Sequence, residues 1–422
     1  MLERKRKLDC ANGREKADLV LKNGNVLNVF TEEVLKADVA ICGDTIVGVG
    51  EYEGKEEIDC TGKYLVPGFI DAHMHIESCM AAPGELAKVL AKAGTTTIIA
   101  DPHEIVNVSG TKGMDYFLKC AAKLLVNVFF MVPSAVPATD VETNGCGEFL
   151  ASDMMKYVDN ARVLGLGETM RFMECCEGEK RMADKLELFA KKHIDGHAPG
   201  IRGKEVQAYR LAGVENDHEC STAEEVLDKL RAGLHIYVRE GSGAKNLETL
   251  IKTMLDAGVC LDRCAFCTDD KHVEEIRKEG HISTCIRKAI ALGVPVAKAY
   301  KMGSYQAAEF YGLKNYGAIG AGYRADIVFL DDLEQVRPLD VMKDGCILTE
   351  EDYAKDYSVP VPDELLHTVH VGEVTKEKIR LSCDGKTDVI QMNPHQIVTT
   401  HLVEEVPAEN GYFKPDGVYK IG

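Results

Sequence analysis

The sequence predicts an α/β fold in which a (β/α)8 barrel is inserted into a small β-sandwich formed by the flanking segments. Three observations support this prediction. From Phe69 onward, apolar strand-like runs alternate with helical ones, and the alternation repeats eight times. Nearly every strand-like run ends in an acid or a histidine, which suits a barrel because its strand ends converge on one mouth. After Gly317 the chain returns to the short strands with which it began.

The local patterns divide the chain into four parts. Residues 17–65 contain short strands separated by Asn-Gly, Gly-Asp and Thr-Gly turn signals. Because single cores stop growing at roughly 250 to 300 residues, a chain of 422 residues suits one barrel with an accessory domain. The predicted parts are the first half of the sandwich (1–66), the barrel (67–316), the second half of the sandwich (317–365) and a C-terminal segment (366–422).

The eight barrel strands are expected where apolar runs end in polar or ionisable residues. They are 68–75, 95–104, 126–135, 161–168, 193–199, 214–219, 234–241 and 264–270. Helices fill the intervals, and one of them is well marked. Ser221 and Glu224 have the spacing of a capping box, and Gly233 follows as a stop signal. Cys264 and Cys267 lie inside the last apolar run, which favours core thiols over a redox or zinc motif.

Composition narrows the class of partner and compartment. The net charge of −18 argues against nucleic acid or an anionic membrane, because both repel such a surface. The basic N-terminus is not followed by the apolar stretch of a signal peptide, and no apolar run reaches the roughly 20 residues of a membrane span. Fifteen cysteines in a large chain of this kind are expected to be reduced. These features predict a cytoplasmic protein with a small-molecule ligand.

The sharpest local feature is the pair His73 and His75 at the end of the first expected barrel strand. Residues two apart on a strand face the same side, so both imidazoles can bind one metal ion in the barrel mouth. Alone, this spacing is weak evidence. Its weight comes from four further residues at other expected strand ends, which are Glu168, His197, His218 and Asp269.

Together these six residues predict a binuclear metal centre. Glu168 is the natural bridge, because the strands before and after it both supply neighbours. Two ions about 3.5 to 4 Å apart lower the pKa of a shared water toward 7 and make hydroxide available at neutral pH. Asp269 would take the proton of that water and pass it to the leaving group, so that hydrolysis needs no covalent intermediate.

Seven other polar residues near strand ends have two open interpretations. They either contact the substrate or, in the case of the acids, the substrate or a metal ion, or they hold the metal ligands in place by hydrogen bonds. We expect them in the substrate site, and they are Glu77, Asp101, His103, Glu104, Arg239, Glu240 and Ser242.

The motifs resemble those of the adenine deaminases in the amidohydrolase superfamily. The segments PGFIDAHMHIES, DPHEI, GLGETM, DGHAPG, NDHE, REGS and CTDD occur in that family's order. The resemblance implies that His73 and His75 bind a first metal, Glu168 bridges, and His197 and His218 bind a second, with Asp269 as the catalytic aspartate.

The resemblance also implies manganese or iron as the metal and adenine and water as the substrates. Hydroxide would attack C6 of adenine to give hypoxanthine and ammonia. Which of Glu77, Glu104 and Glu240 protonates the ring stays open. The family further implies a homo-oligomer and a longer C-terminal domain, of which 366–422 is the opening.

Two other functions compete with this interpretation. One is an amidohydrolase acting on another purine or on a cyclic amide or amidine, because ring identity depends on loop geometry that the motifs do not specify. The other is a non-catalytic scaffold that has lost its metals. The scaffold is disfavoured because all six predicted metal-binding positions carry suitable residues.

Overall fold

Eight parallel strands form the centre of the protein, and all eight were predicted from the sequence. The computed structural model describes residues 2–368, 370–383 and 385–420. The strands are β6 (Phe69–Met74), β7 (Thr95–Ala100), β8 (Asn127–Val132), β9 (Val163–Leu166), β10 (His193–Ile194), β11 (Asn216–Asp217), β12 (His235–Arg239) and β13 (Cys264–Cys267). They are shorter than predicted, because the polar residues at their carboxyl ends leave the ladder and turn into the loops.

The strands close into a barrel. They pair in the order β10-β9-β8-β7-β6 and β11-β12-β13. A parallel bridge between Met74 and Asp269 joins the first strand to the last. Between β10 and β11 the main-chain N–H of Glu215 donates to the carbonyl of Ile194 over 3.0 Å. The carboxyl ends of all eight strands therefore surround one mouth.

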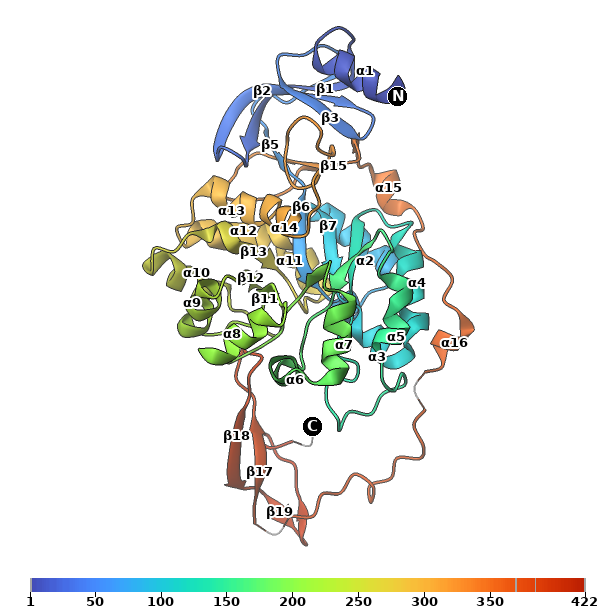
Figure 1. Cartoon of the computed structure of the whole chain (residues 1–422), viewed down its shortest axis with the longest axis vertical. Helices are drawn as coiled ribbons and strands as arrows, with labels where there is room; N and C mark the ends of the chain where they lie inside the picture. Colours follow the sequence, from blue (N-terminus) through green and yellow to red (C-terminus); the bar gives the residue numbers. More distant parts are fainter. Residues whose placement is uncertain (1, 369, 384, 421–422) are drawn as a thin grey trace.

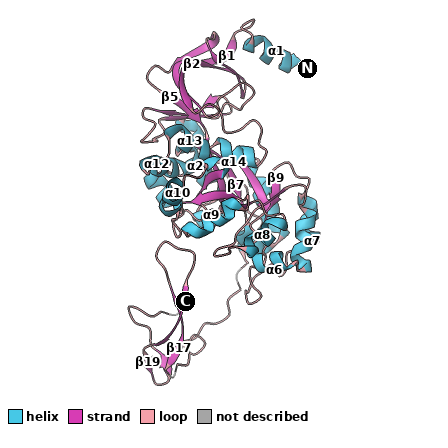
Figure 2. Ribbon diagram, turned by 60° about the vertical axis from the view of Figure 1, so that its left-hand side comes forward, coloured by secondary structure: helices cyan, strands magenta, loops and turns pink. Residues whose placement is uncertain are grey.

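Helices cover the outside of the barrel (Figure 2). They are α2 (Pro83–Lys92), α3 (His103–Ser109), α4 (Thr111–Ala121), α5 (Ala151–Met154), α6 (Phe172–Glu177), α7 (Lys180–Leu188), α8 (Lys204–Leu211), α9 (Ala223–Arg231), α10 (Leu247–Asp256), α11 (Val273–Glu279), α12 (Ile282–Ala291), α13 (Val296–Met302) and α14 (Tyr305–Phe310), with short 3-10 turns at Glu77–Cys79, Met155–Tyr157 and Leu261–Arg263.

The cap predicted for α9 was wrong by one residue. Thr222, not Ser221, is the N-cap, and its hydroxyl accepts from the main-chain N–H of Glu225. The Glu225 carboxylate accepts in return from the N–H groups of both Ser221 and Thr222. Two Ser/Thr-x-x-Glu patterns overlap here, one starting at Ser221 and the other at Thr222. The helix uses the second, because Glu225 is buried and also accepts from the main-chain N–H of Gly200, which ties it to the preceding loop.

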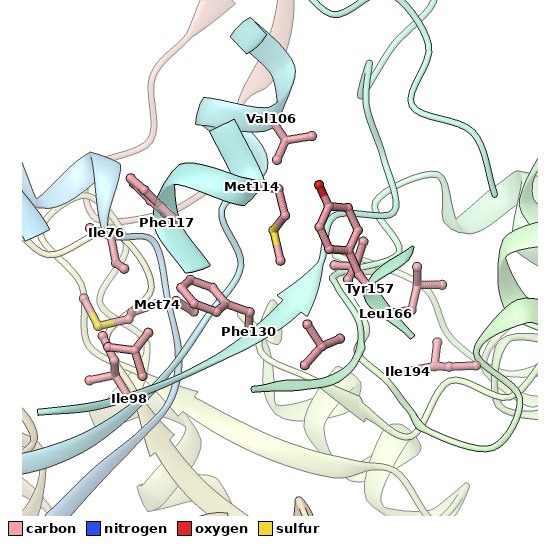
Figure 3. Close-up of a cluster of buried hydrophobic side chains, with 14 of the residues drawn as sticks. Met74, Ile76, Ile98, Val106, Met114, Phe117, Phe130, Tyr157, Leu166 and Ile194 are labelled. Atoms are coloured by element: carbon pink, nitrogen blue, oxygen red, sulfur yellow. The ribbon is translucent and has the colours of Figure 1, made fainter. Parts of the chain in front are cut away.

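Apolar side chains fill the space between strands and helices. One cluster packs strands β6 to β10 against α2, α4 and α7, and Figure 3 shows part of it around Phe130, Met114 and Tyr157. A second cluster lies between β12, β13 and helices α10, α12 and α13. Cys264 and Cys267 are buried free thiols of β13, as the sequence predicted. These cores fix the positions of the strand ends that carry the polar residues.

The segments before and after the barrel meet in one eight-stranded sheet. Its strands are β1 (Ala17–Asn28), β2 (Glu33–Cys42), β3 (Thr45–Gly50), β4 (Gly54–Asp59), β5 (Tyr64–Pro67), β14 (Ile327–Leu330), β15 (Asp340–Lys343) and β16 (Cys346–Ile347). Strand β14 pairs antiparallel with β5, with Val66 opposite Val328. Helix α1 (Leu2–Ala11) lies beside this sheet at the N-terminal end of the molecule (Figure 1).

The C-terminal segment leaves the N-terminal sheet and runs along the barrel to its opposite end (Figure 1). Its elements are α15 (Glu350–Ala354), α16 (Asp363–Leu366), the hairpin β17 (Lys386–Gln391) and β18 (Thr400–Glu405), and the short pair β19 (Ala408–Glu409) and β20 (Tyr412–Phe413). Among the described residues, no helix has the length and apolar character needed to cross a lipid bilayer.

Candidate metal centre

His73 and His75 stand at the carboxyl end of β6 and point their rings to the same place. Their Nε2 atoms lie 3.2 Å apart, and both side chains are buried. His75 Nδ1 donates to the carbonyl of Asp101 over 2.8 Å, because a carbonyl can only accept. That bond leaves the lone pair of His75 on Nε2, which faces His73.

Glu168 lies between two pairs of histidines. Its Oε1 is 3.1 Å from His75 Nε2 and 3.8 Å from His73 Nε2. Its Oε2 is 2.5 Å from His197 Nδ1 and 3.4 Å from His218 Nε2. One carboxylate oxygen thus faces each pair, which is the arrangement that a bridging ligand requires.

Asp269 follows β13 and faces the first histidine pair. Its Oδ1 lies 3.0 Å from His75 Nε2, and its Oδ2 accepts from Arg239 Nη1 over 2.9 Å. The main chain of Asp269 has a φ of 57°, an uncommon conformation for a residue with a side chain. Its N–H donates to the carbonyl of His73, so β6 itself holds this conformation. The structure therefore brings all six predicted metal-site residues together.

The donor set fits divalent metal ions. Five groups of side chains among the described residues each place their ligand atoms within 4.8 Å of one another, and three of them are His73, His75 and Asp269; His73, Glu168 and His218; and His197, His218 and Glu219. Two nitrogens that share an ion at about 2.0 to 2.1 Å lie roughly 3 to 3.5 Å apart, which agrees with the 3.2 Å between His73 and His75. Within the described residues, His73 Nδ1, Glu168 Oε1 and both ring nitrogens of His218 are buried without a hydrogen bond.

The two carboxylates of the centre are held in their charged form. Burial alone would raise the pKa of Glu168, but His197 and His75 outweigh it and hold that pKa well below its ordinary value. Burial opposes ionisation of Asp269 as well, and His75, His218 and Arg239 together lower its pKa. Ionised carboxylates are the form that binds a cation.

The residues after β7 lie nearer to the centre than the sequence suggested. His103 Nδ1 is 3.0 Å from Glu168 Oε1, and Glu104 Oε2 is 3.6 Å from His75 Nδ1. Asp101 is fully buried, and its Oδ2 accepts from the main-chain N–H of Glu168 over 2.9 Å. His103 and Glu104 thus lie where they could bind a metal ion as well as a substrate, whereas Asp101 contacts the main chain of Glu168.

Glu77 is held between the first strand end and α3. Its Oε1 accepts from the main-chain N–H of Ile105 over 3.0 Å. Burial and the neighbouring Glu104 raise the pKa of Glu77 to about 8. Burial likewise raises the pKa of Asp101 to about 7.

The three residues predicted from the loop after β12 have different surroundings. Arg239 is fully buried between Glu219 and Asp269, with ion pairs to both. Glu240 accepts from Lys288 Nζ over 2.5 Å. Ser242 Oγ accepts from the main-chain N–H of His272 over 3.0 Å. Arg239 is thus in direct contact with the centre, while the hydrogen bonds of Glu240 and Ser242 go to Lys288 and to the main chain of His272.

Glu219 is the residue of this centre that the sequence analysis missed. It is fully buried, 3.3 Å from His218 Nε2 and 3.6 Å from His197 Nδ1. The signal was present, because Glu219 directly follows His218 at an expected strand end.

A cavity of about 400 Å3 opens beside Asp269. Its walls include Arg239, Asp270 and the loop 241–244 on the barrel side. A larger cavity of about 950 Å3 lies on the outer wall of the barrel between α2 and α11, away from the histidines. The smaller cavity adjoins Asp269, and its volume suits a small ligand.

Known proteins resemble this chain in sequence or in fold. A model described as "Amidohydrolase family" matches residues 64–349. The adenine deaminase of Desulfitobacterium hafniense (strain Y51) is 46% identical over 408 residues, which cover 96% of this chain and 71% of that protein. Adenine deaminase 2 of Carboxydothermus hydrogenoformans is 43% identical over 96% of this chain and 71% of its own length. A solved atrazine chlorohydrolase from Arthrobacter aurescens TC1, complexed with zinc, shares the fold with a TM-score of 0.57 at 16% identity over 79% of this chain and 96% of that one.

Proposed function

The chain belongs to the adenine deaminases of the amidohydrolase family, and from this premise we propose that it hydrolyses adenine to hypoxanthine and ammonia. The observation that carries the proposal is Glu168, which presents one carboxylate oxygen to each of two histidine pairs at the mouth of the barrel. We infer that the substrate is adenine from a relative named as an adenine deaminase, which is 46% identical.

We assign His73 and His75, with Asp269, to a first divalent ion and His197 and His218 to a second. Glu168 would bridge the two. Ions bound there lower the pKa of water toward 7 and so supply a nucleophile at neutral pH. Mixed imidazole and carboxylate ligands suit manganese or ferrous iron, which are our proposed metals.

We assign the transfer of the water proton to Asp269, which Arg239 holds in position. Asp269 Oδ1 faces the first histidine pair, while Arg239 holds Oδ2 over 2.9 Å and fixes the plane of the carboxylate. In this position Asp269 accepts the proton of the attacking water and delivers it to the amino group that leaves C6. Arg239 acts as a positioning residue, because its guanidinium is committed to Glu219 and Asp269.

A second acid must protonate a ring nitrogen as C6 becomes tetrahedral. Glu240 is paired with Lys288, and Glu77 is buried against α3. Glu104 is 37% exposed while lying 3.6 Å from His75 Nδ1, so it combines access to the mouth with contact to the centre. We assign the ring proton to Glu104 on this geometry.

The wider setting follows from charge and family. We propose a cytoplasmic enzyme whose partners are adenine, water and further copies of itself. The net charge of −18 argues against nucleic acid or an anionic membrane as a partner.

The test is ammonia release from adenine by protein reconstituted with manganese, followed through the absorbance change as hypoxanthine forms. In Asp269→Asn we expect the metal content to persist and turnover to fall by about 10²- to 10⁴-fold, since a proton shuttle is removed. The matched control is Asp388→Asn, on an exposed strand of the C-terminal hairpin, which should leave turnover unchanged. Normal turnover in Asp269→Asn would remove Asp269 from its role. Two bound metals without any turnover of adenine would point to another purine or cyclic amidine.

A further inference from the structure

The cavity beside Asp269 has a wall that the barrel does not supply. On one side lie Arg239, Asp269, Asp270 and the loop 241–244. On the other lie residues 392–397, the loop that joins β17 to β18 at the tip of the C-terminal hairpin. We call these six residues the hairpin tip. The volume of about 400 Å3 is within the range of small-ligand pockets.

We propose that the hairpin tip is a wall of the substrate pocket and that the side-chain amide of Gln396 donates to a ring nitrogen of the purine. This inference rests on the proposed function, and it assigns a specificity residue outside the barrel.

A chain of hydrogen bonds runs from the catalytic aspartate to the hairpin tip. Arg239 Nη1 donates to Asp269 Oδ2, and Arg239 Nη2 donates to Asn246 Oδ1, each over 2.9 Å. Asn246 Nδ2 in turn donates to Gln396 Oε1 over 3.0 Å. Arg239 and Asn246 are both fully buried. The tip is thus tied to the same guanidinium that orients Asp269.

This chain fixes which end of the Gln396 amide points away from the barrel. An arginine has only donors, so the oxygen of Asn246 must face Arg239 and its NH2 must face Gln396. Gln396 therefore uses its oxygen on Asn246 and turns its NH2 elsewhere. In the described part of the chain that NH2 makes no hydrogen bond, and Gln396 is only partly exposed. The unprotonated ring nitrogens of adenine are acceptors that match such a donor.

The rest of the tip provides an apolar surface. Met392 is 76% exposed and Ile397 is 41% exposed, and both line the cavity together with Pro394. A flat purine ring would cover these side chains and remove their apolar surface from water. The tip is fastened to the barrel by one further bond, from the main-chain N–H of Lys245 to the carbonyl of His395 over 3.1 Å.

The first test compares the same substitution at two positions of the hairpin. Gln396→Leu should raise KM for adenine about tenfold, which corresponds to the loss of one hydrogen bond of about 1.4 kcal/mol. Gln391→Leu, at the exposed end of β17 outside the cavity, should leave KM unchanged. Inhibition constants of 3-deazaadenine and 7-deazaadenine then locate the bond. For the analogue that lacks the bonded nitrogen, Gln396→Leu should cause no further loss.

The second test does not depend on turnover. The protein contains no tryptophan, so Met392→Trp introduces a single fluorescent reporter at the tip. Titration with adenine should change its emission and saturate, whereas Val403→Trp, on β18 of the same hairpin, should not respond. Adding Gln396→Leu to the tip reporter should raise the half-saturating concentration about tenfold, as it does KM.

The outcomes separate this inference from the proposed function. Normal adenine turnover, with neither a tip response nor a changed KM in Gln396→Leu, would overturn the inference and leave the function intact. A saturable tip response without turnover would keep the pocket wall and overturn the adenine deaminase activity. Equal effects of Gln396→Leu and Gln391→Leu would show a general disturbance of the hairpin and would also overturn the inference.

Discussion

The barrel and the C-terminal hairpin contain similar apolar residues in very different surroundings. In β8, Val128, Phe130 and Val132 have no exposed surface at all. In the hairpin, Ile390 is 72% exposed and Val403 is 58% exposed. The hairpin also lies at the far end of the molecule from the N-terminal sheet (Figures 1 and 2). The same residue types thus stabilise the barrel through burial and contribute little in the hairpin.

The difference indicates that the two regions have different roles. The barrel has its own cores and holds six metal-site residues on its strand ends and adjoining loops. Among the described residues, the hydrogen bonds between the hairpin and the mouth lie at its tip, where Lys245 and Asn246 bond to His395 and Gln396. We therefore expect substitutions in the barrel core and at its strand ends to lower stability and metal binding. We expect substitutions at the hairpin tip to change substrate binding without changing either.

The largest effect should follow from Glu168→Gln in the barrel. Loss of the bridging charge should reduce metal affinity by more than about 100-fold, because even changes in residues that only support the ligands weaken binding by 10- to 100-fold. Metal analysis of the purified variant measures this directly. Glu405→Gln, an exposed glutamate of β18, is the matched control and should retain full metal content. Retention of both ions in Glu168→Gln would show that this residue is not the bridge.

A large loss of stability is expected from Phe130→Ala. Phe130 is completely buried in the cluster of Figure 3, so the variant loses burial and leaves a cavity that costs about 3 to 5 kcal/mol. The free energy of unfolding from denaturant titration is the measurement. A loss below about 1 kcal/mol would mean that the barrel repacks around this position far more easily than its full burial indicates.

An intermediate effect is expected in limited proteolysis. Lys376, Lys378 and Arg380 are exposed in the segment before β17, and few buried contacts hold that segment. Trypsin should cut there first and release an intact barrel fragment, which mass spectrometry identifies. Early cuts within α2 to α14 instead would erase the contrast between the two regions.

The smallest effect is expected from Phe413→Ala in the C-terminal segment. Phe413 is only partly buried in the short strand β20, so the same substitution as in Phe130→Ala should change the stability of the barrel by less than about 0.5 kcal/mol. The unfolding midpoint of the barrel is again the readout. A loss as large as that of Phe130→Ala would show that the C-terminal segment is part of the barrel's cooperative unit.

The strand ends could be predicted from the sequence because their signal is local. His73 and His75 show the two-residue period of a strand, and Glu168 is the last residue of the expected run 161–168. The barrel rule that strand ends converge then places such residues together without any knowledge of contacts. This reasoning recovered the eight strands and the six predicted metal-site residues, but not Glu219.

The remaining features depend on contacts between distant residues. The position of His103 beside Glu168 depends on how α3 turns after β7, which no periodicity specifies. Gln396 lies 150 residues beyond Asn246 in sequence, so nothing near it in the chain indicates a role at the mouth. Glu219 could have been found, since its position at a strand end equals that of His218.

The pairing of β5 with β14 has a consequence for biosynthesis. Val66 cannot pair until its partner Val328 has been synthesised, roughly 260 residues later. At about 5 to 20 residues per second, the unpaired edge of β5 is exposed for on the order of 10 to 50 seconds. The barrel strands emerge during this interval and can fold first, so the N-terminal sheet is completed after the barrel. An unpaired strand edge invites association with other chains, so the nascent N-terminal strands are exposed to such association until β14 emerges.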